Sequence, residues 1–213
     1  DGAKSAVWAQ SVGGATAPTV LLELPDISPY ASLSPDGRSV LLQSLVDQRW
    51  RVQSVMLDSS HAFRDFNAST GFEITPRFSP DGRWAAFASS ESGAFEVYVR
   101  SYPEPTVKVQ VSAGGGGGPV WSADGSRLYY ASGNAIVEAR LATTPGMRVV
   151  SRDTAFAQVP NGLTDRGQPN FDISRDGSRI VIPSAESGAY PLVVVPNWLT
   201  EFRQRMGASN SKR

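Results

Sequence analysis

The sequence predicts an all-β protein of the β-propeller class, on two observations. A Ser-x-Asp-Gly tetrapeptide followed by a strand pattern occurs four times, beginning at Ser34, Ser79, Ser122 and Ser174. The copies recur roughly every 45 residues, the length of a propeller blade with four short antiparallel strands. The chain also holds 20 Gly and 15 Pro among 213 residues, which is typical of many tight turns and few long helices.

The copy that begins at Ser79 gives the clearest blade. Its turn runs through Pro80, Asp81 and Gly82. Pro fits the first central position of such a turn, Asp can bind the backbone, and Gly tolerates a positive φ. Apolar residues alternate on both faces of the strand that follows, which indicates burial between neighbouring blades. The predicted strands of this blade are residues 74–79, 83–89, 95–100 and 107–112.

The same plan divides the rest of the chain. The predicted units are the outer strands of an incomplete blade (1–27), blades at 28–66, 74–112, 118–158 and 168–196, a short C-terminal helix (197–207) and a disordered tail (208–213). The helix is expected from Asn197 as its cap and from an apolar stripe that includes Trp198 and Phe202.

The chain starts and ends within a blade, and it opens on Asp1 rather than Met. We therefore expect an excised or processed piece of a longer protein. A four-bladed ring that closes by pairing its termini is one interpretation. Part of a larger propeller is favoured, because four blades is the lower limit for such rings.

Composition excludes several classes of partner. The 20 basic and 20 acidic residues are interspersed, without the basic stripe of a nucleic-acid-binding protein. The absence of Cys excludes disulfides, thiolate metal sites and Cys nucleophiles. No apolar run is long enough to span a bilayer, so no direct membrane insertion is expected.

Catalytic and cofactor motifs are lacking. His61 is the single histidine, and no Gly-x-Ser-x-Gly nucleophile motif accompanies it. Arg64-Asp65-Phe66 lacks the residues that surround a kinase signature. Gly114–Gly118 is not followed by Gly-Lys-Ser/Thr, which favours a flexible connector over a phosphate-binding loop. We expect no catalytic residues, no bound metal and no cofactor in this chain.

The four motif aspartates have two interpretations. Asp36, Asp81, Asp124 and Asp176 occupy equivalent positions in different blades, so a ring holds them apart. Paired-carboxylate catalysis needs carboxyl groups roughly 5–9 Å apart. A structural role, in which each Asp accepts backbone N–H groups of its own hairpin, is therefore favoured over Ca²⁺ binding or acid–base chemistry.

Two stretches carry a family resemblance. Phe78-Ser79-Pro80-Asp81-Gly82 resembles the TolB-like (WD-repeat-like) propeller repeat of bacteria. Trp121-Ser122-Ala123-Asp124-Gly125 is similar, with Ala for Pro. The other two copies depart from the pattern by Leu33 and Ile173 before the serine. The resemblance covers roughly residues 28–195.

A narrower resemblance is to the C-terminal propellers of bacterial serine/threonine protein kinases. It lies in residues 89–100, in Tyr102-Pro103 and in the ending 192–198. In that family a cytoplasmic kinase domain precedes a membrane segment and an extracytoplasmic sensor propeller. The resemblance implies a sensor module in a periplasmic or extracytoplasmic location, with the kinase portion outside this chain.

The candidate ligand-binding residues come from the innermost strands, which should face the central channel or its rim. They are Tyr30, Arg77, Asn170 and Asp172, with Arg77 and Asp172 as the polar anchors, and Glu73 joins them from the connector. The partner would be a protein or a small molecule at the propeller face; a solvated channel without a ligand is the alternative. Two other functions stay open, a TolB-like periplasmic protein-interaction scaffold and the gating propeller of a prolyl-oligopeptidase-type hydrolase.

Overall fold

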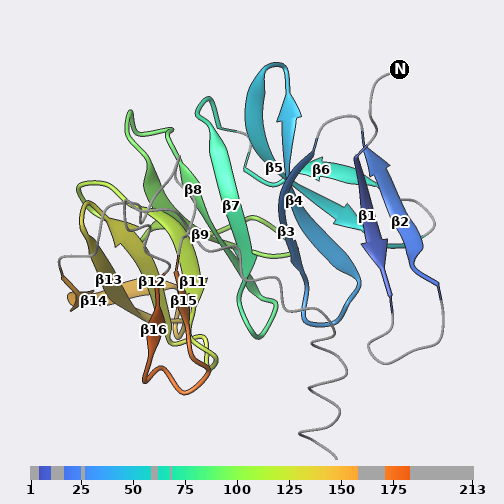
Figure 1. Ribbon diagram of the computed structural model, residues 1–213. Helices are drawn as coiled ribbons and strands as arrows, with labels where there is room; N and C mark the ends of the chain where they lie inside the picture. The colour runs from blue at the N-terminus through green and yellow to red at the C-terminus, as the bar shows by residue number, and fades with distance from the viewer. Residues whose placement is uncertain are drawn as a thin grey trace, which may run out of the picture.

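The computed structural model describes residues 5–10, 17–24, 27–58, 62–67, 69–157 and 171–182. Three four-stranded antiparallel sheets follow one another along the chain, and a two-stranded pair lies at each end of the row (Figure 1). Within each sheet the spatial order of the strands is their order in the sequence. This arrangement confirms the predicted all-β propeller architecture.

The strands have the following bounds. The first pair is β1 (Ser5–Ala9) and β2 (Thr19–Leu24). The first sheet holds β3 (Ile27–Leu33), β4 (Ser39–Val46), β5 (Arg49–Met56) and β6 (Phe63–Asp65). The second holds β7 (Glu73–Phe78), β8 (Trp84–Ser89), β9 (Glu96–Ser101) and β10 (Lys108–Gln110). The third holds β11 (Gly117–Trp121), β12 (Arg127–Ser132), β13 (Ala135–Ala142) and β14 (Arg148–Phe156). The last pair is β15 (Asp172–Ile173) and β16 (Ile180–Val181).

No helix occurs within these described ranges. The predicted helix at 197–207, the tail at 208–213 and the strand expected near residue 192 lie outside them.

The core lies between sheets, and β8 shows why. Its side chains alternate between the two faces of its sheet. Ala86 packs in a cluster with Leu128 of the third sheet, whereas Phe87 packs in a cluster with Leu41 of the first sheet. Ala86 and Phe87 have no exposed surface. Burial on both faces, as the sequence predicted, stacks each sheet on its neighbours.

The first strands of successive sheets are neighbours around the centre. The Phe78 amide of β7 donates to Ser32 Oγ of β3 at 3.0 Å, and Trp121 Nε1 of β11 donates to the Arg77 carbonyl at 3.2 Å. Pairing with the second strand slips at a bulge in β3, β7 and β11. Two residues of these bulges, Thr75 (φ 54°) and Gly118 (φ 60°), lie four positions before a motif serine.

The four Ser-x-Asp-Gly turns share one hydrogen-bond pattern. In the second turn, Ser79 Oγ donates to Asp81 Oδ1 at 2.6 Å, and the same oxygen accepts the Arg83 amide at 3.1 Å. The glycine has a φ of +70°, which favours glycine over any other residue. The equivalent serine-to-aspartate bond is 2.6 Å in the other three turns as well. Each aspartate therefore binds the backbone of its own hairpin, as predicted.

Candidate functional site

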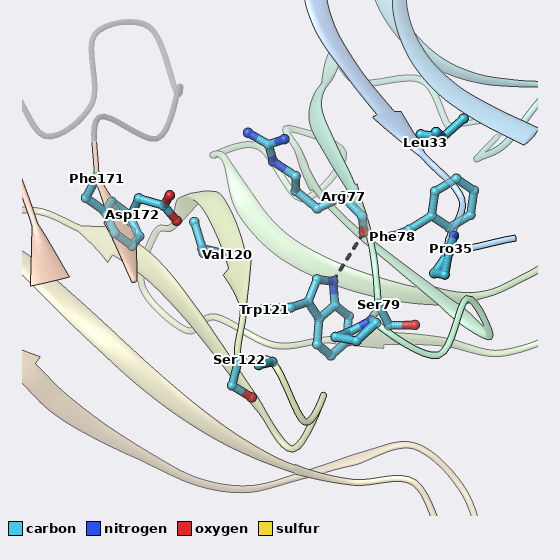
Figure 2. Close-up of a pocket in the computed structure, with 12 residues that line it drawn as sticks. Leu33, Pro35, Arg77, Phe78, Ser79, Val120, Trp121, Ser122, Phe171 and Asp172 are labelled. Atoms are coloured by element: carbon cyan, nitrogen blue, oxygen red, sulfur yellow. Dashed lines mark hydrogen bonds between the residues drawn. The ribbon is translucent and has the colours of Figure 1, made fainter. Parts of the chain in front are cut away.

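A cavity of about 470 Å³ lies where the first strands of the three sheets and β15 come together. Because every one of these strands contributes to it, the cavity sits at the convergence of the inner strands (Figure 2). Its lining residues are Leu33, Pro35, Arg77, Phe78, Ser79, Pro80, Val120, Trp121, Ser122, Ala123, Phe171 and Asp172.

Arg77 brings a cation to this cavity. Its side chain is half-buried, and its guanidinium group points away from Phe78 (Figure 2). In the described part of the chain, that group has neither a hydrogen bond nor an ion pair. The backbone is fixed instead, because the Arg77 carbonyl accepts the indole N–H of Trp121. A guanidinium group without a partner among the described residues is suited to bind a carboxylate or a phosphate.

Asp172 brings a carboxylate to the opposite wall. It begins β15, its side chain is exposed, and its Oδ1 accepts the Ile173 amide at 2.8 Å. Among the described residues it forms no ion pair with Arg77. The two charges therefore remain available to a ligand, above apolar walls that include Trp121 and Phe171.

The sequence-predicted residues separate into three groups. Arg77 and Asp172 lie on the same cavity. Tyr30 is half-buried on β3 and is not among the cavity residues. Asn170 lies outside the described residues.

Glu73 is the remaining candidate, and it lies in a buried hydrogen-bond network. Its side chain is 1% exposed. Oε1 accepts Asn67 Nδ2 at 3.0 Å and Ser69 Oγ at 2.7 Å, and Oε2 accepts the Val52 amide at 3.1 Å. Burial raises the pKa of its carboxyl group above the ordinary value, against these hydrogen bonds. These contacts give Glu73 a structural task, which is to tie β7 to β5 of the preceding sheet.

The sequence reasoning missed the apolar part of the cavity. Leu33, Phe78 and Trp121 each stand immediately before a motif serine, and all three line the cavity. The recurrence of a large apolar residue at that position was the available signal. It was interpreted as part of the repeat pattern, although its members converge on one site.

The turn aspartates are held by the hydrogen bonds of their own turns. The Ser122 hydroxyl, followed by the backbone and hydroxyl of Ser126, lowers the pKa of Asp124 to about 2. In the fourth turn, hydrogen bonds from Ser174 and Ser178 likewise lower the pKa of Asp176 to about 2. Both carboxylates are stabilised by their own turns. Across the described ranges, no cluster of three or more His, Cys, Asp or Glu residues could hold a metal ion.

His61, the single histidine, lies outside the described residues. A search of the described residues for a helix long and apolar enough to cross a bilayer finds none.

Comparison with known proteins gives one relative by sequence. No family model matches the chain. An uncharacterised protein of Agrobacterium fabrum is 31% identical over 135 residues, which cover 63% of this chain and 45% of that protein.

Solved structures give the fold. TolB from Acinetobacter baumannii superposes with a TM-score of 0.62 at 18% identity over 80% of this chain, and a protein assigned as TolB from Agrobacterium tumefaciens with 0.52 at 20% over 75%. An oligogalacturonate lyase in complex with manganese superposes with 0.56 at 15% over 81%. The chain covers 41%, 58% and 49% of these proteins, respectively.

These structural neighbours show that the chain has a TolB-like β-propeller fold. Their low identity shows the fold alone, and they include an enzyme. The predicted resemblance to kinase-linked propellers is not confirmed by them and stays a prediction.

Proposed function

We propose that this chain is a non-catalytic binding module that takes its ligand in the cavity between Arg77 and Asp172. In this proposal it forms the extracytoplasmic or periplasmic sensor portion of a bacterial receptor-type serine/threonine kinase. The observation that carries the binding site is the guanidinium group of Arg77, which has no partner among the described residues and belongs to a residue that lines a cavity with aromatic walls.

The chemistry of the cavity favours a ligand with an anionic group on an apolar body. Arginine binds planar anions through two parallel hydrogen bonds, and nearby apolar walls strengthen such contacts by lowering the local dielectric constant. Asp172 can accept a hydrogen bond from a donor elsewhere on the ligand. A volume of about 470 Å³ lies within the range of ordinary ligand pockets.

The hydroxyl groups of the cavity support a binding role over nucleophilic catalysis. Ser79 Oγ donates to Asp81 and accepts the Trp84 amide at 3.0 Å. Ser122 Oγ donates to Asp124 and accepts the Arg127 amide at 2.9 Å. Both hydroxyls are therefore occupied in turn formation, whereas a nucleophilic serine needs a positioned base.

A second candidate function is a periplasmic protein-interaction scaffold without an attached kinase. The structural similarity to TolB favours it. It would use the same cavity, so the two candidates differ in what the parent protein carries rather than in this site. A third candidate function for the same fold is the gating propeller of a prolyl-oligopeptidase-type hydrolase.

A thermal-shift screen tests the site. Carboxylates, sugar acids and acidic peptides are screened against the native chain and against Arg77→Ala and Asp172→Ala. Arg64→Ala is the matched control, because Arg64 is an exposed cation on the outer strand β6. We expect the stabilisation by a hit to be lost in the two cavity variants and retained in the control. Equal stabilisation of all the variants would reject the site.

A further inference from the structure

A second cavity, of about 550 Å³, lies between the first and second sheets and borders the first cavity. It runs from the first Ser-Pro-Asp-Gly turn past the end of β5 to the loop after β9. Its lining residues are Ser34, Pro35, Asp36, Arg38, Ser39, Met56, Asp81, Gly82, Tyr102 and Pro103. Pro35 belongs to the walls of both cavities.

The wall between the two cavities is aromatic as well. Phe78 lines the first cavity and Tyr102 lines the second. Their rings meet edge to face, with centroids 4.8 Å apart. Pro35, Phe78 and Tyr102 thus form an apolar boundary between the two cavities.

The second cavity is suited to an apolar side chain. Met56 is 37% exposed at the end of β5, and Ser39 Oγ contacts its sulfur at 3.3 Å, which holds the thioether in place. Pro35, Tyr102 and Pro103 supply further apolar surface. Met side chains adapt to ligands of varied shape.

Charge does not select the ligand of the second cavity. The carboxylates of Asp36 and Asp81 line it, but Arg38 lines it too, and Asp81 pairs with Arg83 at 2.7 Å. These four charges cancel. Arg77 lines the first cavity, and among the described residues its guanidinium group has no hydrogen bond or ion pair that would neutralise it, so we place an anionic group of the ligand there.

We propose that the two cavities form one recognition site for an extended peptide segment of a partner protein. The segment places an acidic side chain on Arg77 and, after crossing Pro35, an apolar side chain against Met56 and Tyr102. This inference rests on the proposed function for the first cavity. It adds the class of partner and a second subsite.

The shape of the site supports a peptide over a compact small molecule. Each cavity alone has the volume of a small-ligand pocket, and the two share Pro35 as a wall, so a ligand that occupies both must extend across this residue. An extended peptide advances about 3.3 Å per residue and sends alternate side chains to one face. It can therefore fill both cavities while its backbone passes over Pro35.

Selection from a displayed library of random linear peptides tests this inference with the full chain. The strongest binders are synthesised with a fluorescent label, and their affinity is measured by anisotropy for the native chain, Arg77→Glu and Met56→Glu. Val150→Glu is the matched control, because Val150 is an exposed apolar residue on β14, away from both cavities. Met56→Ala serves as a second variant if Met56→Glu does not fold.

We expect selected peptides to share an acidic residue a few positions from an apolar one. Arg77→Glu and Met56→Glu should each weaken binding by about tenfold or more, and Val150→Glu should leave it unchanged. If Arg77→Glu weakens binding and the Met56 variants do not, the second subsite is wrong and the proposed function stands. If the Arg77 variant binds as the native chain does, or if no peptide is selected, the peptide inference is overturned. The thermal-shift screen then tests the proposed function separately, because that function still predicts that Arg77→Ala loses the stabilisation by a small ligand.

Discussion

Gly82, in the second turn, lies directly against Pro35 of the first turn: a Cβ atom on Gly82 would be 3.3 Å from Pro35 Cδ. The same relation recurs one blade later, where a Cβ atom on Gly125 would be 3.6 Å from Pro80 Cδ. The repeated Pro and Gly of the motif therefore serve contacts between successive blades as well as the turns themselves. These contacts also form the wall of the second cavity, which both Pro35 and Gly82 line.

Gly82→Ala should destabilise the protein more than Gly37→Ala. Both glycines have nearly the same φ, +70° and +71°, but a Cβ atom on Gly37 would meet nothing within 4 Å. Gly37→Ala therefore costs only backbone strain, about 1 kcal/mol, and Gly82→Ala adds the contact with Pro35, for a total of about 2 kcal/mol. Urea unfolding measures both. Equal losses would show that the turns do not pack on one another.

Gly116→Ala should destabilise the protein although Gly116 lies in a run of five glycines. A Cβ atom there would be 2.7 Å from Ser112 Cβ and 3.0 Å from Tyr130 Cδ2. We expect a loss of about 1–3 kcal/mol from overpacking. Gly146→Ala is the control, because that position is open and its φ is not positive, so it should be neutral or slightly stabilising. A neutral Gly116→Ala would mean that the run is only a flexible connector.

Glu73→Ala should be among the most damaging single changes. It leaves the buried Val52 amide and the Ser69 hydroxyl without their acceptor, and Asn67 Nδ2 keeps only its bond to Glu91, at a cost of about 3 kcal/mol. Glu104→Ala, at an exposed position, should have little effect. The free energy of unfolding measured in urea compares the two variants. A Glu73→Ala variant as stable as the control would contradict the buried network.

Glu73 also gives a pH dependence with a defined sign. Burial raises its pKa in the folded state, so the folded protein holds this proton more tightly than the unfolded chain does. The contribution of this group to stability is therefore full below the ordinary glutamate pKa and falls as the pH rises through the raised value. In Glu73→Gln, the free energy of unfolding should no longer fall over this pH range, because glutamine does not titrate. A steeper decline in the variant would contradict the assignment.

The turn aspartates change the stability with pH in the direction opposite to that of Glu73. The pKa of Asp124 is lowered to about 2, chiefly by Ser122. Its contribution to stability is present above the ordinary aspartate pKa and is lost as the pH falls toward 2. Asp124→Asn should therefore reduce the acid dependence of the melting temperature between about pH 4 and pH 2, measured by circular dichroism. If the melting temperature of Asp124→Asn fell with decreasing pH as steeply as that of the native chain, the hydrogen bonds of this turn would not persist in solution.

The sequence predicted most of the fold and two of the residues that line the candidate cavity. The recurring turns predicted successive antiparallel sheets because Asp and Gly have strong local preferences, and the alternating apolar residues of β8 predicted burial on both sides. Arg77 and Asp172 were predicted as anchors from their spacing before a motif serine, and the structure places both on one cavity. Glu73 is expected on a connector, whereas the structure makes it the first residue of β7, before the bulge in that strand, with its side chain buried.

Two features depend on tertiary contacts that local patterns do not encode. Thr75 adopts a φ of 54°, which is uncommon for a β-branched residue, and its Oγ1 is buried without a partner in the described structure. Its amide is held by Gln43 of the neighbouring sheet at 3.0 Å. The second cavity likewise arises only where the turns of two blades meet. Neither the Thr75 conformation nor this cavity could therefore be predicted from the sequence of one blade.

The central claim is that Arg77 anchors the ligand in the cavity at the inner strands. Its most direct test is the dissociation constant of the strongest binder found in either screen, measured for the native chain, Arg77→Ala and Arg64→Ala. We predict that Arg77→Ala weakens binding by about tenfold or more, with the fold intact and Arg64→Ala unchanged. Equal dissociation constants for all three proteins would contradict the claim.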